Sequence, residues 1–179
     1  MNMADCVRLR TEMKAGDLGR IVSLHGELYA RECGFDLTFE AYVAGPLAEF
    51  VRSHSPANRL WIAEHEDRIV GCVAIVAASA GAAQLRWYLV VPERRRHGLG
   101  RRLLTEAIAF SRQQGYETVS LWTVSALAAA AKQYRAAGFR KAEEKPGTLW
   151  GKDVVEEKYE LELRRCGVAG AGAPSAETG

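Results

Sequence analysis

The chain has 179 residues, 48% hydrophobic and 26% charged, which suits one ordinary domain with a buried core and excludes a broadly disordered protein. Lys and Arg number 24 and Asp and Glu 22, and this near balance disfavours a general nucleic-acid-binding protein. The four cysteines, at positions 6, 33, 72 and 166, form no C-x-x-C pair, which disfavours a zinc site and a disulfide framework. We expect no bound metal, and free thiols in a reducing, cytoplasmic location.

No segment suggests export or a membrane span. The first ten residues include Asp5, Arg8 and Arg10 and lack the apolar stretch that signal peptides carry. The longest apolar run, residues 69–83, is interrupted by Gly71 and Gly81 and is too short to cross a bilayer. We therefore expect neither a membrane nor nucleic acid among the partners.

The first third of the chain predicts one short strand and two helices. Apolar and charged residues alternate over Val7–Arg10, as in a half-buried strand. Apolar residues recur at helical spacing over Asp17–Arg31, and Gly34 is expected to end that helix. A second helical pattern covers Thr38–Val51, and Pro46 inside it is expected to kink or divide the helix.

The remaining elements alternate between strand and helix. The period of the apolar residues switches repeatedly between two and 3.6, which separates the two kinds of element. Six strands are expected over Arg59–Glu64, Ile69–Ala77, Gln84–Val91, Thr118–Val124, Phe139–Glu143 and Asp153–Leu163, and two helices over Leu99–Gln114 and Ala126–Ala137.

This order of elements predicts a single α/β domain over residues 1–165, built on one mixed sheet with helices on both faces. From Cys166 onward the composition falls to Gly, Ala, Ser and Thr with few other residues. Such a segment cannot bury enough apolar surface to fold, so we expect residues 166–179 to form a disordered tail.

One segment has the composition of an anion-binding site. Residues 91–102 read Val-Pro-Glu-Arg-Arg-Arg-His-Gly-Leu-Gly-Arg-Arg: a strand end, a basic turn, two glycines and a helix start. Glycine lets backbone N–H groups approach a ligand, and a helix N-terminus carries partial positive charge, so the segment suits a pyrophosphate. It does not match a Walker A motif, because no Lys-Ser or Lys-Thr follows the glycines. It does not match a dinucleotide fingerprint either, because Leu103 stands where a third glycine or alanine is needed. A solvated basic turn is the alternative.

Two motifs carry a family resemblance. Pro92-x-x-Arg95-x-x-Gly98-x-Gly100, after Tyr88-Leu89-Val90, resembles the R/Q-x-x-G-x-G/A acetyl-CoA motif of the GCN5-related N-acetyltransferases (GNAT family). Downstream, Gln133-Tyr134-Arg135-Ala136-Ala137-Gly138-Phe139 is similar to the L-Y-x-x-x-G-F segment of that family. The resemblance covers residues 5–163 and implies the GNAT fold: a mixed, mostly antiparallel sheet of six to seven strands with helices on both faces, splayed between strands four and five.

A narrower likeness concerns residues 25–30 and 144–153. These stretches resemble the acetyltransferase half of bacterial proteins that fuse a MarR-type winged helix to a GNAT domain. We expect no such DNA-binding half among these 179 residues.

The resemblance implies acetyl-CoA as the co-substrate. The backbone of Tyr88, Leu89 and Val90 is expected to pair with the pantetheine arm, and the N–H of Val90 to polarise the thioester carbonyl. The residues expected around the pyrophosphate are Arg95, Arg96, His97, Gly98, Leu99, Gly100 and Arg101.

The resemblance further implies an N-acetyltransferase (EC 2.3.1.-) in which a primary amine attacks the thioester directly in a ternary complex. The acceptor is expected to be a small molecule, a peptide N-terminus or a lysine. Tyr134 matches the position of the family's general acid, which would protonate the leaving thiolate. His25, Tyr29 and Trp150 are expected to bind the acceptor. Four side chains are candidates for the general base: His25, Glu27, Glu32 and Glu64.

Two positions depart from the family pattern: Leu127 stands where Asn is frequent, and Gln133 where Leu is common. Leu127 leaves open an acyl-CoA-binding sensor with little turnover as the alternative function. A nucleic-acid contact by the basic turn is a third interpretation. Relatives often pair through sheet edges, so a homodimer is a further expectation.

Overall fold

The computed structural model describes residues 7–163, so the tail predicted at 166–179 lies outside the described residues. One sheet holds all seven strands of this part of the chain: β1 (Arg8–Arg10), β2 (Arg59–His65), β3 (Arg68–Ser79), β4 (Ala82–Val90), β5 (Thr118–Val124), β6 (Arg140–Leu149) and β7 (Lys152–Glu162). Their order in the sheet is β1-β2-β3-β4-β5-β7-β6. The β4–β5 pair is parallel and every other neighbouring pair is antiparallel, which confirms the mixed, mostly antiparallel sheet.

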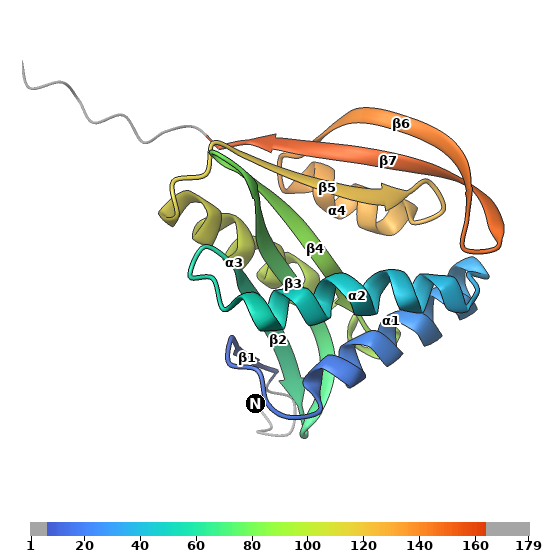
Figure 1. Cartoon of the computed structure of the whole chain (residues 1–179), viewed down its shortest axis with the longest axis horizontal. Helices are drawn as coiled ribbons and strands as arrows, with labels where there is room; N and C mark the ends of the chain where they lie inside the picture. Colours follow the sequence, from blue (N-terminus) through green and yellow to red (C-terminus); the bar gives the residue numbers. More distant parts are fainter. Residues whose placement is uncertain (1–6, 164–179) are drawn as a thin grey trace, which may run out of the picture.

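Four α-helices of the described part of the chain cover the sheet: α1 (Asp17–Cys33), α2 (Leu37–Ser53), α3 (Leu99–Gln113) and α4 (Ala128–Ala136). Figure 1 shows α1 and α2 crossing in front of the strands, with α3 and α4 behind them. Buried side chains of the helices, such as Leu47 of α2 and Leu103 of α3, join the sheet in one hydrophobic core. No helix within residues 7–163 is both long and apolar enough to cross a membrane.

Helix α2 runs without a break through Pro46, so the expected division of this helix is wrong. The helix begins at Asp36, whose carboxylate accepts a hydrogen bond from the Thr38 backbone N–H at 2.9 Å. Phe39, Val43 and Leu47 are buried on one face of the helix. This packing on both sides of the proline compensates for the one backbone hydrogen bond that Pro46 cannot make.

Strand β6 is twice as long as predicted, because it continues through Pro146 and Gly147. It begins at Arg140 rather than Phe139 and continues through Pro146, which pairs opposite Val155 of β7. Strand β6 is at the edge of the sheet, so no further strand pairs with its outer side. Proline, which has no backbone N–H, is tolerated in such an edge strand. Helix α4 is shorter than the 126–137 predicted from its alanine content.

Strands β4 and β5 pair only at their beginnings. Residues 82–84 of β4 lie opposite residues 118–120 of β5, and no pairing follows. Figure 1 shows the two strands starting side by side and then diverging, which confirms the expected split. Strand β4 has a bulge beside this split. Two of its residues, Trp87 and Tyr88, lie opposite a single residue of β3, Val73. The backbone of Trp87 has a φ of +49° there, and its carbonyl accepts a hydrogen bond from the Cys72 thiol at 3.0 Å.

A buried charge cluster joins β1, α1 and β2. Arg10 donates two hydrogen bonds to the carboxylate of Asp17, at 2.7 and 2.9 Å, and a further pair to Glu64. Burial by itself would raise the pKa of Asp17, but the hydrogen bonds from Arg10 and from the Lys14 N–H hold it below its ordinary value. The side chain of Asp17 is completely buried, so its charge depends on these partners.

We predict that Asp17→Asn lowers the free energy of unfolding by about 3 kcal/mol, because the substitution leaves the buried guanidinium of Arg10 with an incomplete partner. The pKa of Asp17 is lowered in the folded state, so its contribution is present above the unfolded value near 3.8 and is lost as the pH falls through the folded value. Urea denaturation at pH 7 and at low pH measures both effects.

The matched control is Glu49→Gln, which removes one partner of the exposed Glu49–Arg52 pair on α2. It should change the free energy of unfolding by less than about 0.5 kcal/mol. Equal effects of the two substitutions would contradict the structural role of the Arg10–Asp17 pair.

Candidate active site

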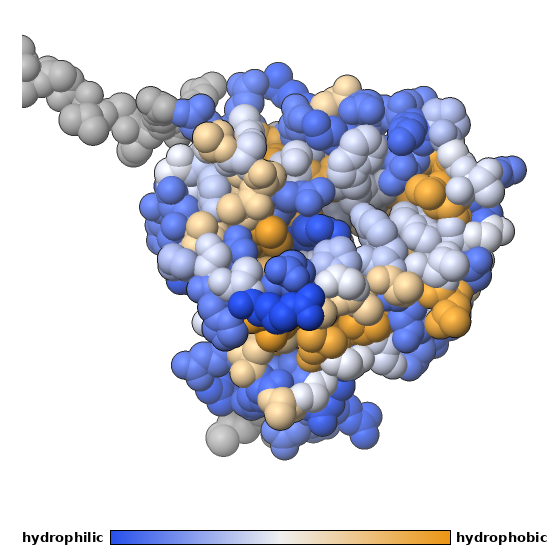
Figure 2. Space-filling view, in the orientation of Figure 1, coloured by the Kyte–Doolittle hydropathy of each residue, from blue (hydrophilic) through white to orange (hydrophobic). Residues whose placement is uncertain are grey.

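The widest part of the split opens into a pocket on the face of the sheet that α1 and α2 cover. Its cavity volume is about 100 Å³. His25 and Tyr29 of α1 and Trp150, in the turn between β6 and β7, all line it. Figure 2 shows this face of the molecule hollowed, with residues of intermediate hydropathy around the hollow. The three residues expected to bind the acceptor are thus brought together from both ends of the domain.

Stacked aromatic rings form one wall of this pocket. The rings of Tyr29 and Phe39 lie 4.5 Å apart between centroids, and Trp150 lies 4.9 Å from Phe35 and 5.2 Å from Tyr42. The backbone N–H of Asp36 donates to the carbonyl of Trp150 at 3.0 Å and ties the β6–β7 turn to the start of α2. The wall is therefore assembled from helix and hairpin residues that are distant in sequence.

His25 is buried in α1 with its ring at the pocket. Its Nδ1 lies 2.8 Å from the carbonyl oxygen of Ile21, which can only accept, so Nδ1 carries the proton of the neutral ring. Burial lowers the pKa of His25 to about 4, and the hydrogen bond to Ile21 only partly opposes this effect. At neutral pH the imidazole is therefore uncharged, and its Nε2 offers a lone pair.

The structure separates the other three candidates for the general base from the pocket. The carboxylate of Glu64 belongs to the Arg10 and Lys14 cluster described above. Glu32 forms an ion pair with Arg95 at 2.8 Å, and Glu27 accepts a hydrogen bond from Ser23 at the surface. Of the four candidates, His25 alone lines the acceptor pocket.

Tyr134 of α4 lines the pocket from the opposite face of the sheet. Its ring is buried and lies 5.5 Å from that of Tyr88. Its hydroxyl has no hydrogen-bond partner within the described residues. Every side-chain oxygen there that is fully enclosed does have a partner, so the Tyr134 oxygen is not fully enclosed and reaches the pocket surface. Burial raises the pKa of Tyr134 well above its ordinary value, with smaller contributions from Tyr29 and Tyr88. The proton therefore remains on the oxygen at neutral pH.

A second hollow lies at the start of α3, where the sequence predicts an anion-binding turn. Five of the predicted pyrophosphate residues line it: Arg95, Arg96, Gly98, Gly100 and Arg101. The backbone at Arg96 and Gly98 has φ values of +67° and +81°, and Gly98 begins α3 without any side-chain cap. This left-handed turn leaves the first N–H groups of a 15-residue helix available for an anion. By contrast, the Leu99 side chain packs in the core, and His97 is exposed and does not line the hollow.

A cleft lies between the basic hollow and the pocket beside His25 and Tyr29. It shares Val90, Arg95 and Gln133 with the hollow, and Tyr29, Tyr88 and Leu127 with the pocket. Leu89 also lines the cleft, so all three β4 residues predicted to contact pantetheine face it. The three spaces therefore lie next to one another along the split.

Gly100 lies directly beneath two hydrogen-bonded side chains. The hydroxyl of Tyr88 donates a 2.5 Å hydrogen bond to the side-chain oxygen of Gln133 directly above Gly100. A Cβ at position 100 would collide with both of these side chains. Gln133, which departs from the family pattern, thus has a partner of its own in Tyr88.

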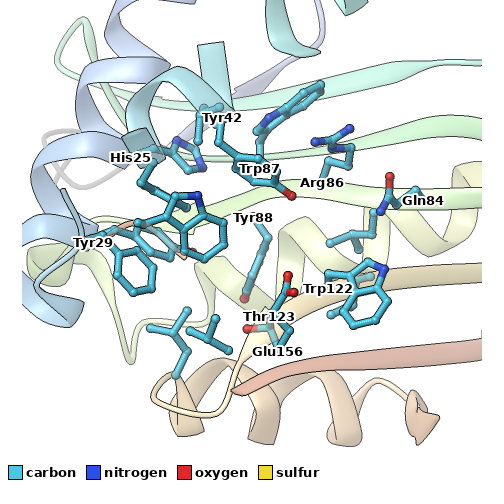
Figure 3. A pocket seen from close by; sticks show the side chains of 18 of the residues that line it. His25, Tyr29, Tyr42, Gln84, Arg86, Trp87, Tyr88, Trp122, Thr123 and Glu156 are labelled. Carbon is cyan, nitrogen blue, oxygen red and sulfur yellow. The ribbon is translucent and has the colours of Figure 1, made fainter. Parts of the chain in front are cut away.

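Several lining residues were not predicted from the sequence. Arg86 of β4, Trp122 of β5 and Glu156 of β7 all contribute to the acceptor pocket. Figure 3 shows Arg86 and Gln84 at one end of the pocket, His25 and Tyr29 at the other, and Tyr88 and Glu156 between them. Their positions depend on strand register and on the bulge in β4, neither of which the local sequence reveals.

The polar groups of the site are oxygen and nitrogen groups that suit an organic ligand. Within residues 7–163 no three His, Cys, Asp or Glu side chains gather as metal ligands would. Cys33 and Cys72 are buried free thiols, and burial raises the pKa of Cys72 to about 12. The arginines, glycines and narrow cleft fit a long ligand with a charged diphosphate end, as coenzyme A has.

Comparison with known proteins agrees with this geometry. A sequence model of the acetyltransferase (GNAT) family matches residues 26–139. An uncharacterized N-acetyltransferase of Schizosaccharomyces pombe is 31% identical over 118 residues, which cover 64% of this chain and 72% of that protein. Human N-acetyltransferase 8 is 30% identical over 100 residues, covering 53% of this chain and 44% of the human protein.

Solved structures share the fold over nearly the whole chain. A proposed acetyltransferase from Salmonella typhimurium, solved with its cofactor acetyl-CoA, has a TM-score of 0.73 and 19% identity, covering 96% of this chain and 99% of that chain. A ribosomal-protein-alanine N-acetyltransferase from Brucella melitensis has a TM-score of 0.72 and 18% identity, covering 87% and 99%. With the family match over more than half of the sequence, these findings show that the chain belongs to the GNAT family of acetyltransferases.

Proposed function

We propose that this protein transfers an acetyl group from acetyl-CoA to a primary amine, which attacks directly in a ternary complex. The observation that carries the proposal is a row of three adjoining spaces, which we infer to form one path for a ligand: the hollow at the basic turn beside Gly98, the cleft beside β4, and the pocket that contains Tyr134. Such a path accommodates a diphosphate, a thin arm and a reactive group in that order. A small molecule, a peptide N-terminus or a lysine side chain would present the amine from the pocket mouth.

The residues of the path have distinct binding tasks. Arg95, Arg96 and Arg101, with the free N–H groups after Gly98, would hold the diphosphate. The edge of β4 that faces the split, from Tyr88 to Val90, would pair with the pantetheine arm. The N–H of Val90 would donate to the thioester carbonyl, as an oxyanion-hole donor does.

Acetyl-CoA supplies an acetyl thioester when it is bound. In the overall reaction a C–N bond forms, the C–S bond breaks, the amine loses one proton and the sulfur gains one. Tyr134 would supply the proton to sulfur; this role is supported by a hydroxyl that reaches the pocket and remains protonated. At pH 7 only about one alkylamine in 2,500 is neutral, so the aromatic wall, which excludes water, would favour the reactive form. His25 would accept a hydrogen bond from the amine through Nε2.

We expect Tyr134→Phe to reduce thiol release from acetyl-CoA by a factor of about one hundred or more, with the Kd for acetyl-CoA unchanged. Phenylalanine keeps the ring contact with Tyr88 and removes only the acid. Because the pKa of Tyr134 is raised, the wild-type rate should not decline at alkaline pH up to about 10. Steady-state rates and calorimetry measure these quantities.

The control is Tyr116→Phe, since the Tyr116 hydroxyl bonds the Ala57 carbonyl at 2.8 Å outside all three spaces of the path. It should leave the rate unchanged. An undiminished rate in Tyr134→Phe would refute the acid assignment. Tight acetyl-CoA binding with no thiol release from a broad amine panel would instead favour the sensor function that Leu127 suggests.

A second prediction concerns Gly100, beneath the Tyr88–Gln133 hydrogen bond. Gly100→Ala should weaken acetyl-CoA binding at least about tenfold, because the added Cβ displaces Tyr88 and Gln133 into the path. Gly45→Ala is the matched control in α2, where a Cβ meets no atom within 4 Å. Calorimetric titration of both variants gives the comparison, and equal affinities would contradict the proposed route of the ligand.

A further inference from the structure

Two opposite charges line the acceptor pocket, and the reaction described above uses neither. Arg86 extends from β4 and Glu156 from β7, on the two sides of the split. Both side chains belong to half-buried residues, where an unpaired charge is costlier than at the surface. Figure 3 shows the Arg86 nitrogens and the Glu156 oxygens in the same pocket.

Neither charge is paired with another side chain of residues 7–163. Over the described range, the Glu156 side chain forms no hydrogen bond or ion pair, and the Arg86 guanidinium forms none with a carboxylate. Two lysines lie close to Glu156 in the sheet, but Lys158 pairs with Glu160 at 2.7 Å, and Lys145, opposite on β6, forms no ion pair with Glu156. The guanidinium of Arg86 lies 5.0 Å from the centre of the Trp87 ring, which fixes its position without neutralising it.

The register of the sheet places both side chains on one face. A side chain at Gly71 of β3 would meet Leu103 of α3 on the rear face, so Ala74, three residues later, lies on the front face. Arg86 pairs opposite Ala74 and therefore lies on the front face too. Tyr159 of β7 contacts Tyr134 of α4 on the rear face, so Glu156, three residues earlier, lies on the front face. Both charges consequently face the space beneath α1 and α2, where the amine must enter.

We propose that the acceptor is a zwitterionic amine, in its simplest form an α-amino acid with an apolar side chain. Glu156 binds its ammonium group on entry and takes up the proton that this group must lose before the neutral amine attacks. Arg86 binds its carboxylate, and the aromatic wall around Tyr29 and Trp150 holds the side chain. The proposal rests on the acetyltransfer function above and names the class of acceptor. It follows from complementarity: opposite charges that share a pocket without pairing match a ligand that carries both.

The arrangement also orients the reaction. Glu156 lies near Tyr88 in the middle of the pocket, whereas Arg86 lies toward Gln84 at one end (Figure 3). An ammonium at Glu156 is thus next to the opening of the cleft, and a carboxylate at Arg86 is directed away from it. An amine without a carboxylate leaves Arg86 desolvated and unpaired, which lowers its affinity.

Three matched acceptors test the proposal: L-phenylalanine, its methyl ester, and 2-phenylethylamine, which lacks the carboxyl group. The wild-type protein should show a kcat/KM for thiol release at least about tenfold higher with phenylalanine than with either analogue. In Arg86→Gln this preference should fall to about one, while 2-phenylethylamine loses less than about threefold. Glu156→Gln should weaken all three acceptors alike, because each carries the ammonium group.

The control is Arg59→Gln, since Arg59 of β2 also lies over an aromatic ring, Phe110 at 4.3 Å, but outside the acceptor pocket. It should retain the wild-type preference. Quenching of tryptophan fluorescence by phenylalanine, with coenzyme A present, provides a binding readout that needs no turnover, since Trp87, Trp122 and Trp150 line the pocket.

Preference for the ester or for 2-phenylethylamine, or a preference that survives Arg86→Gln, would overturn the proposal. So would the absence of both quenching and thiol release with phenylalanine. The acetyltransfer function would still stand in these cases if acetyl-CoA binds and another amine releases thiol in a way that depends on Tyr134. Failure of acetyl-CoA to bind would instead refute the proposed function itself.

Discussion

The separation of β4 from β5 is the constraint on which the site depends. Beyond Gln84 and Ser120 the two strands no longer share hydrogen bonds, so each presents a backbone edge to the space between them. The bulge at Trp87 lies at this point, and its carbonyl is held by the Cys72 thiol. An unpaired edge inside a domain is costly unless a ligand or solvent satisfies it, which makes the split a binding feature.

The elements around the split give it a direction. The turn before α3 is basic and rich in free N–H groups, whereas the opposite end is aromatic and enclosed by α1, α2 and the β6–β7 turn. Arg95 links the two ends, since it bonds the Val90 carbonyl at 2.9 Å and pairs with Glu32 of α1. The polar end of a ligand would thus bind at the basic turn and its reactive end at the aromatic end. A direct transfer between two bound substrates requires such fixed positions.

Much of the fold and half of the site follow from local sequence. Apolar periodicity identifies nearly every helix and strand, and the glycines at 98 and 100 identify the anion-binding turn, because both signals lie within short segments. Arg86 and Glu156 could not be found this way: the side of the sheet that each faces depends on the β4 bulge and on the pairing of β7 with β5. The length of β6 was missed because Pro146 is tolerated only at a sheet edge. The narrower likeness to MarR–GNAT fusions, the homodimer and the cytoplasmic location stay predictions.

The most direct measurement is a crystal structure of the protein with coenzyme A. The account predicts that the diphosphate lies on the turn at Arg96–Gly100, that the arm hydrogen-bonds the free edge of β4, and that the sulfur lies beside the Tyr134 hydroxyl. A nucleotide bound elsewhere, or strands β4 and β5 paired along their full length around an excluded ligand, would contradict it.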